Sequence, residues 1–366
     1  MAAVFALGSN GSGQLGIGHR DDVSVPKPVL FPEGSPTTVT SLVAGGNHTL
    51  VLSGAGELYW SGDASSGACG HVPGPTRPVF RKMDVGPPST ATSPVGMVTA
   101  TWGASVFTRL NALGLNADIY TCGTGEKGEL GHGPHIVRLP VPELIPHFPP
   151  AGLHVVDLAA CMGHVVVVLS NGEAYGWGAG RKGQLGSPAD VVFSPRKIEG
   201  VGFGIKRAVC GKDFTCLLGD PSDGDYLVLG LDKWGLRSSI PNAVPKWHDV
   251  GAGWSNFYLL GADGVILSWG RNDHGQGLSN HPVKFLAMAI GSEHALGLSE
   301  NGDVLAWGWG EHGNCGPPTP GATTGGQANV IVSSRYVPER SNVAKVGAGC
   351  ATSWIVIQSY TPVESP

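Results

Sequence analysis

A short glycine-rich turn returns along the whole chain, and it constrains the fold more than any other feature. Its clearest copy, residues 8–16, reads GSNGSGQLG. Four further copies and two degenerate ones follow at residues 122–131, 177–186, 269–278, 307–316, 61–70 and 229–237. Glycines at fixed positions favour tight turns, so seven copies indicate a protein built from one repeated unit.

A second motif accompanies the first: a small residue, then a polar residue, then an apolar run. The polar residue marks each copy, at His48, Ser105, His164, Asp213, Asn256, His294 and Thr352. Each marker opens one predicted strand. Short strands, glycine turns and a period of about 50 residues are typical of β-propeller blades. We therefore predict an all-β fold, a seven-bladed β-propeller that forms a single domain over residues 1–366.

Hairpin signals divide each predicted blade. Glycines that follow a small or polar residue and precede an alternating strand are expected at positive φ; they are Gly56, Gly172, Gly264 and Gly302. Leu15 of the glycine turn is expected to pack between blades, and Cys69 and Cys315 replace it in two copies. Residues 134–152 and 317–342 are predicted to be surface excursions, and residues 220–246 fit the repeat least well.

The two ends of the chain supply complementary halves of one blade. The first predicted strand, residues 4–7, runs directly into a glycine turn, and residues 343–357 supply the inner strands that this first repeat lacks. We expect the N- and C-terminal strands to pair and close the ring, because closure removes exposed sheet edges.

Composition limits the classes of partner. The net charge is −5, so no basic footprint predicts direct binding of nucleic acid. The chain has no apolar run of 18 residues and no secretory signal pattern, so we expect no membrane partner and a cytoplasmic and nuclear location. The 7 cysteines form no C-x-x-C pair and are expected to be buried reduced thiols, with zinc ligation or disulfides as the alternatives.

The alternation of these two motifs resembles the repeat of the regulator of chromosome condensation family, whose members form seven-bladed propellers. The resemblance covers the whole chain. Four segments are more narrowly similar to the alpha-tubulin suppressor branch of that family, which comprises one-domain fungal proteins: residues 4–19 (VFALGSNGSGQLGIGH), 291–298 (GSEHALGL), 307–317 (WGWGEHGNCGP) and 349–357 (GCATSWIVI).

The resemblance implies an accessory binding protein. That branch is known for binding a small CSL-type zinc-ribbon electron carrier of the diphthamide pathway. The implied function is a non-enzymatic heterodimer that supports diphthamide synthesis on elongation factor 2 and, indirectly through Elongator, tRNA wobble-uridine modification. It implies no direct contact with tubulin.

Two other functions stay open. One is guanine nucleotide exchange on a Ran-type GTPase, the activity of the family's founder. The negative charge and the lack of a basic arm before the first strand count against it. The other is a hydrolase or lyase of propeller form, because propeller axes often host chemistry.

No catalytic, cofactor or metal residues are predicted. His48, His164 and His294 share a repeat position but fall on different blades, so we expect structural hydrogen bonds to neighbouring backbone. Glu311, His312 and Cys315 resemble a metal site, yet Cys315 should point inward. The G-x-G-x-x-G pattern at residues 123–128 precedes no predicted helix, which dinucleotide binding requires.

The predicted binding surface consists of tryptophans that the repeat does not require: Trp102, Trp254, Trp309 and Trp354. Three of them fall in or beside the loops that enter the marker strands, and the resemblance implies that such loops line a protein-binding face. Tryptophan is enriched in interface hot spots. Polar residues expected beside them are Lys212, Asp213, Glu293, His294, Glu311 and His312. The alternative is that the tryptophans pack inside the blades.

Overall fold

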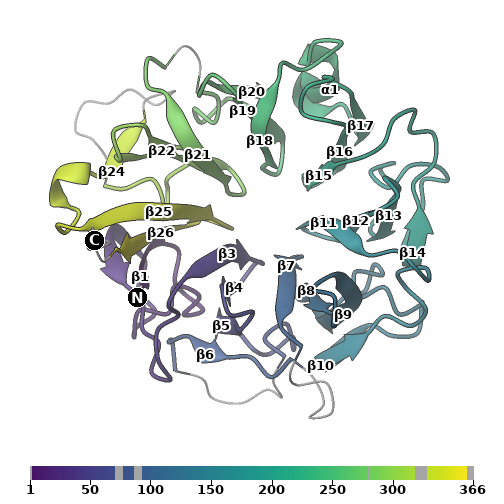
Figure 1. The fold of residues 1–366 in the computed structure, drawn as a ribbon, viewed down its shortest axis with the longest axis horizontal. Helices are drawn as coiled ribbons and strands as arrows, with labels where there is room; N and C mark the ends of the chain where they lie inside the picture. Colours follow the sequence, from purple (N-terminus) through teal and green to yellow (C-terminus); the bar gives the residue numbers. More distant parts are fainter. Residues whose placement is uncertain (1, 71–76, 86–92, 279–280, 318–327, 361–366) are drawn as a thin grey trace, which may run out of the picture.

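The computed structural model describes residues 2–70, 77–85, 93–278, 281–317 and 328–360. Antiparallel sheets are arranged around a central axis, which Figure 1 shows end-on. Apart from strands, the described residues contain the 3₁₀ turns η1 (Lys233–Gly235) and η2 (Ser334–Tyr336) and the helix α1 (Leu236–Ser239). The prediction of an all-β propeller is confirmed.

The sheets follow one another in chain order. The first contains β3 (Val39–Ala44), β4 (His48–Ser53), β5 (Leu58–Gly62) and β6 (Arg81–Lys82). An eight-stranded sheet follows, made of two four-stranded halves: β7 (Val95–Ala100), β8 (Ala104–Leu110), β9 (Asn116–Thr124) and β10 (Arg138–Leu144), then β11 (Val155–Cys161), β12 (His164–Leu169), β13 (Ala174–Gly178) and β14 (Val192–Lys197). Only the pair Val155–Asn116 joins strand β11 to strand β9.

Three further sheets complete most of the ring. They contain β15 (Arg207–Cys210), β16 (Phe214–Leu218) and β17 (Tyr226–Gly230); β18 (Trp247–Ala252), β19 (Asn256–Gly261) and β20 (Ile266–Gly270); and β21 (Phe285–Ile290), β22 (His294–Ser299), β23 (Val304–Gly308) and β24 (Asn329–Val332). The innermost strands β3, β7, β11, β15, β18, β21 and β25 each contact the next, and β25 (Ser341–Ala348) contacts β3.

Both ends of the chain build the remaining sheet. Its order is β2 (Val23–Pro28), β1 (Ala2–Gly8), β26 (Thr352–Ser359) and β25. Strand β1 pairs with β26 without interruption, from Ala2 opposite Gln358 to Gly8 opposite Thr352. The expected pairing of terminal strands is therefore observed.

One glycine position recurs at the end of the third strand of every unit in the described chain. Its φ lies between +100° and +119° at Gly8, Gly62, Gly123, Gly178, Gly230, Gly270 and Gly308. At each, a Cβ would collide with the carbonyl oxygen of the turn that joins the unit's two innermost strands. The next residue donates a hydrogen bond to that same oxygen, as from Ser9 to Ala351 at 2.8 Å. Only glycine permits this close approach of two turns.

Most predicted turns are confirmed. The hairpin glycines Gly56, Gly172, Gly264 and Gly302 have φ between +75° and +81°. Leu15 is fully buried and packs with residues of two neighbouring sheets, such as Val4 and Tyr59, and Cys69 and Cys315 are buried in the equivalent place.

Three predictions about irregular segments are wrong in part. The seventh glycine turn, at residues 229–237, is instead the end of β17 followed by η1 and α1, because the Asp232 carboxylate accepts the backbone N–H of Arg237 (2.6 Å) and Ser238 (3.3 Å). The predicted excursion at residues 134–152 contains the outer strand β10, which pairs with β9. The excursion at 317–342 contains β24 and η2, and its residues 318–327 lie outside the described part.

Candidate functional site

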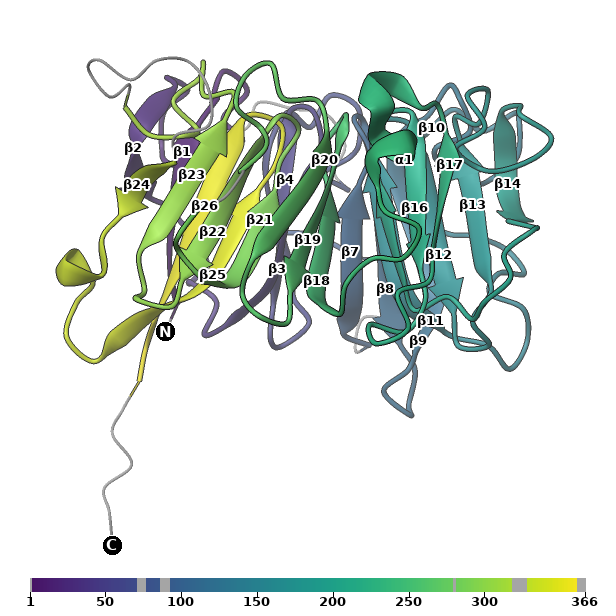
Figure 2. The same ribbon diagram turned by 90° about the horizontal axis from the view of Figure 1, so that it is seen from above.

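The tight turns between inner and second strands lie on one side of the ring, which we call the turn face. These turns comprise residues 45–47, 101–103, 162–163, 211–213, 253–255, 291–293 and 349–351. The glycine turns lie beside them, tied by the hydrogen bonds just described. Helix α1 follows strand β17 on the same side and lies at the upper edge of Figure 2.

Two tryptophans meet across the centre of the turn face. Trp102 lies in the turn after β7 and Trp254 in the turn after β18, on separate sheets, yet their ring centroids are 6.2 Å apart. Backbone hydrogen bonds between successive turns fix both, since Trp102 N–H donates to Met162 (2.7 Å) and Trp254 N–H to Ser292 (2.7 Å). Trp102 remains 45% exposed. The two indoles therefore form a firmly held apolar patch.

A lysine lies directly beside this patch. The Lys212 Nζ is 5.3 Å from the centre of the Trp254 ring, within range of a cation–π interaction. Its backbone N–H donates to the Trp254 carbonyl oxygen at 2.9 Å. The turn after β15 thus presents a cation next to the aromatic pair, and Asp213 follows it, half-buried.

A central cavity of about 410 Å³ lies under the two tryptophans. Small residues of the inner strands line most of it, together with the thiols of Cys161, Cys210 and Cys350. Burial raises the pKa of the Cys161 thiol to about 12, so this thiol stays protonated and is a poor nucleophile. Arg207 forms ion pairs with Asp157 (3.6 Å) and Asp249 (3.2 Å), which ties three inner strands together.

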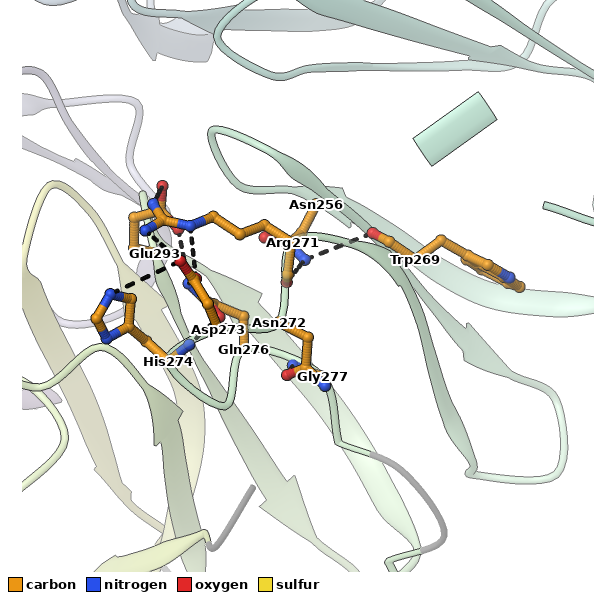
Figure 3. A network of polar contacts seen from close by, with 9 residues as sticks. All are labelled: Asn256, Trp269, Arg271, Asn272, Asp273, His274, Gln276, Gly277 and Glu293. Carbon is orange, nitrogen blue, oxygen red and sulfur yellow. Dashed lines mark hydrogen bonds and ion pairs between the residues drawn. The ribbon is translucent and has the colours of Figure 1, made fainter. Parts of the chain in front are cut away.

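A second aromatic cluster surrounds Arg271, which directly follows β20. Figure 3 shows this arginine and its polar contacts. The guanidinium carbon lies 5.5 Å from the Trp234 ring centre and 5.7 Å from that of Trp309. His274 stacks on Trp309 at 4.4 Å. Trp234 is 50% exposed and Trp309 38%. An arginine between two tryptophans, flanked by a stacked imidazole, therefore forms an exposed aromatic surface on the turn face.

Two carboxylates neutralise this arginine. Its Nε donates to Asp273 at 2.6 Å, and one terminal nitrogen donates to Glu293 at 3.1 Å. Gln276 Nε2 donates to the other Glu293 oxygen at 3.0 Å, and the Asn256 amide bonds the Arg271 carbonyl (Figure 3). The charge of Arg271 is thus satisfied within the chain, and the cluster is held rigidly.

The fold and this turn face can be compared with known proteins. Residues 3–355 match the model of the RCC1-like domain. The chain belongs to this family. An RCC1 repeat-containing protein of Schizosaccharomyces pombe is 30% identical over 377 residues, which cover 97% of this chain and 99% of that protein. The mouse secretion-regulating guanine nucleotide exchange factor is 28% identical over 75% of this chain and 61% of its own length.

Solved structures agree on the RCC1-like fold. Human WBSCR16 superimposes with a TM-score of 0.80 at 16% identity, covering 99% of this chain and 100% of that one. Prp20p of Saccharomyces cerevisiae gives a TM-score of 0.80 at 22% identity, covering 99% and 92%. At such identities the likeness extends to the fold alone.

The RCC1-like scaffold brings some of the predicted binding residues together. Trp102, Trp254, Lys212 and Asp213 gather at the centre of the turn face. Trp309 lies farther from the axis, in the Arg271 cluster. Glu311 and His312 are exposed on the glycine turn after β23, where His312 Nδ1 lies 2.9 Å from an Asp22 carboxylate oxygen. This contact links the turn to the residue that precedes β2.

Three predicted binding residues are not available to a partner. Trp354 is fully buried because it is the third residue of β26 and its ring points into the core. Glu293 is 8% exposed and pairs with Arg271. His294 is buried at the start of β22. Their placement on an exposed docking surface is therefore wrong.

The three repeat histidines each reach the following sheet. Their Nε2 atoms lie within hydrogen-bond distance of a hydroxyl: His48 and Ser105 Oγ at 3.0 Å, His164 and Thr215 Oγ1 at 2.9 Å, His294 and Ser353 Oγ at 2.9 Å. We expected structural histidines bonded to neighbouring backbone; they are structural, but the partners are side-chain hydroxyls. Burial lowers the pKa of each histidine to about 4.

Neither metal binding nor dinucleotide binding has much support in the described residues. No group of three or more His, Cys, Asp or Glu side chains in that part is placed to hold a metal ion, and Cys315 is buried as expected. The G-x-G-x-x-G pattern at 123–128 runs into a turn rather than a helix. No helix within the described ranges has the length and apolar character needed to cross a membrane.

Sequence reasoning missed Trp234, Arg271 and His274. Trp234 lies in the segment that departs from the repeat. It has a φ of +63° in η1, and no sequence pattern predicts that conformation for a tryptophan. Arg271 and His274 occupy variable positions of a glycine turn. The sequence holds a partial signal for Arg271. Trp269-Gly270 marks the end of the third strand, so the next residue, Arg271, is expected on the turn face.

Proposed function

We propose that this RCC1-like protein is a non-enzymatic, protein-binding seven-bladed propeller that forms a heterodimer with a small zinc-ribbon electron carrier. Through that partner it supports diphthamide synthesis on elongation factor 2 and Elongator-dependent modification of tRNA wobble uridine. The observation that carries the binding function is the Trp102–Trp254 pair with Lys212 at the centre of the turn face. Exposed tryptophan beside a polar rim is typical of interface hot spots.

The choice of partner is supported by sequence similarity. The segments at residues 307–317 and 349–357 resemble the alpha-tubulin suppressor branch more closely than the general repeat requires. The fission-yeast RCC1 repeat-containing protein is similar to this chain along nearly its whole length.

The test is calorimetry and size-exclusion chromatography with the purified zinc-ribbon protein. We expect a one-to-one complex. Replacing both Trp102 and Trp254 by alanine should weaken it by at least about 30-fold, because truncating even one hot-spot tryptophan costs about 2 kcal/mol or more. Leu113→Ala is the matched control, since Leu113 is 80% exposed on the hairpin between β8 and β9, on the opposite face. Equal binding by all these variants would exclude the centre of the turn face as the site.

Trp309→Ala and Glu311→Lys test the outer part of the face in the same assay. Both residues are exposed, and Glu311 has no resolved interaction with the buried network around Arg271. We expect a smaller loss of affinity than for the central pair, because interface energy concentrates near the centre.

The second candidate is guanine nucleotide exchange on a Ran-type GTPase. It is favoured by the similarity to the mouse secretion-regulating guanine nucleotide exchange factor and by the structural likeness to Prp20p, a protein with binding properties to Gsp1p and histones. Release of labelled GDP from Ran, measured with and without this protein, decides between the two. Accelerated release together with no zinc-ribbon complex would favour exchange.

A further inference from the structure

A groove of about 890 Å³ opens on the turn face beside Trp102. Three successive units contribute to it: those that contain β7–β10, β11–β14 and β15–β17. We call it the turn-face groove, defined by Trp102, Lys127, Lys182, Phe193 and Lys212. Its volume lies within the range of pockets that bury a ligand or a short peptide segment.

The apolar part of the groove is held in place from behind. Trp102 lines both this groove and the central cavity. The carbonyl that anchors Trp102 belongs to Met162, which also lines both spaces and has a φ of +48°. A non-glycine residue in that conformation is strained, and such strain clusters at functional sites.

The groove also gathers cations, and three of them form no ion pair with the residues that the structure describes. Four line it: Lys127, Arg181, Lys182 and Lys212. Arg181 lies 3.7 Å from Asp190, whereas the three lysines are exposed and form no ion pair within the described part of the protein. Since the whole chain carries a net charge of −5, three unpaired lysines in one groove are a local exception.

Three carboxylates line the groove beside its four cations. They are Glu126, Glu129 and Asp213. Glu129 accepts the backbone N–H of Lys127 at 2.7 Å, and burial raises the pKa of its carboxyl, which disfavours its charged form. The Arg271 cluster differs in kind, because two carboxylates already satisfy its cation.

We propose that the turn-face groove binds an acidic, extended segment of a partner protein. An apolar side chain of that segment packs against Trp102 and Phe193, and its carboxylates approach Lys127, Lys182 and Lys212. This inference rests on the proposed function and adds to it the footprint and the charge of the bound segment. Charge complementarity of this kind sets orientation and association rate.

A single-stranded nucleic acid also combines stacking with cations, but it fits less well. Such proteins line a long groove with positive charge and several stacking platforms. Here the lysines alternate with carboxylates, and the groove offers one exposed indole.

The test uses the purified full-length chain and the purified zinc-ribbon protein in titration calorimetry at 50 and 300 mM salt. We expect the triple variant Lys127→Glu, Lys182→Glu, Lys212→Glu to bind about 30-fold more weakly at low salt. The loss should be smaller at high salt, because salt screens the attraction between the lysines and the acidic segment. The matched control reverses the charge of three lysines on the opposite face, near the starts of β15, β18 and β21. These substitutions are Lys206→Glu, Lys246→Glu and Lys284→Glu. It should leave the affinity within about twofold of wild type.

The outcomes separate the two proposals. If wild type binds the zinc-ribbon protein and the groove variant binds it equally well, the groove is not the footprint, although the proposed function stands. If wild type does not bind it, a fluorescein-labelled Glu- and Asp-rich peptide with one central tryptophan tests the groove alone. Loss of peptide binding in the groove variant supports the inference. Binding of labelled oligouridylate in place of this peptide overturns it.

Discussion

Lowering the pH from 7 to 5 is expected to destabilise the propeller by about 2 kcal/mol for each of three buried histidines, or about 6 kcal/mol in total. His48, His164 and His294 have folded-state pKa values of about 4, mainly because burial disfavours the charged ring, and an unfolded value of 6.5. Between these pH values the unfolded chain binds protons that the folded chain excludes. Stability is therefore full above pH 6.5 and falls as the pH drops toward 4.

The structural cost of protonation explains the size of this effect. Each imidazole lies between two sheets and shares one hydrogen bond with a hydroxyl of the next sheet, at 2.9 to 3.0 Å. A second proton would place a charge where no carboxylate accepts a hydrogen bond from it. Loss of stability should thus appear as loosening between neighbouring sheets.

Urea unfolding at pH 7.5, 6 and 5 checks this prediction. His164→Gln should lower stability at pH 7.5 but reduce the slope of stability against pH by about one third, since one of three titrating groups is gone. Leu113→Ala, at an exposed position without a titrating group, is the control and should leave the slope unchanged. A wild-type stability that is flat between pH 7.5 and 5 would contradict the role given to these histidines.

Replacing Gly123 by alanine is expected to lower the free energy of unfolding by about 3 kcal/mol, through strain at positive φ and displacement of a turn. Gly123 has a φ of +116°, and an added Cβ would meet the Gly103 carbonyl oxygen and the Ala104 backbone. Neither contact is the end of a flexible side chain, so the two turns must separate. That separation also weakens the 2.9 Å hydrogen bond from Thr124 to Gly103.

A second glycine of the same repeat serves as the control. Gly11 belongs to the first glycine turn, but a Cβ there would meet nothing within 4 Å. Gly11→Ala should change stability by no more than about 0.5 kcal/mol. Thermal and urea unfolding of both variants measure the difference. If Gly123→Ala is as stable as Gly11→Ala, the close approach of the turns is not the reason that glycine is required at position 123.

The repeated turns could be predicted from the sequence because positive φ leaves a direct signal, glycine. The register of the marker strands could not be predicted everywhere. Ser105 and Asp213 were aligned with His48, yet Ala104 and Phe214 open strands β8 and β16. Since neighbouring residues of a strand face opposite sides, a shift of one residue exchanges buried and exposed positions. Ser105 is in fact the partner of His48 rather than its equivalent.

Exposure of the tryptophans was equally hard to infer. Trp102 lies at the tip of a turn and Trp354 two residues inside a strand, and both follow similar small-residue motifs. The Arg271 cluster draws its members from the segment after β17, two glycine turns and the turn before β22. No local sequence pattern links such distant segments, so the cluster could be recognised only in the three-dimensional structure. The groove lysines also come from three units and show no charge run in the sequence.

The shared sheet of β1 and β26 has a consequence for biogenesis. Strand β1 can pair with β2 early in synthesis, but its pairing with β26 waits until residues 352–359 have left the ribosomal exit tunnel. Until then the nascent ring is an open arc with two unpaired strand edges, a state prone to sticking to other chains. The last pairing of this sheet therefore waits for β26 to emerge, and it joins strands that lie far apart in the described chain, which is a slow step for polymer-entropic reasons. Chaperone holding during synthesis should consequently matter more for yield of this protein than for a β-protein whose sheets are each built from consecutive strands.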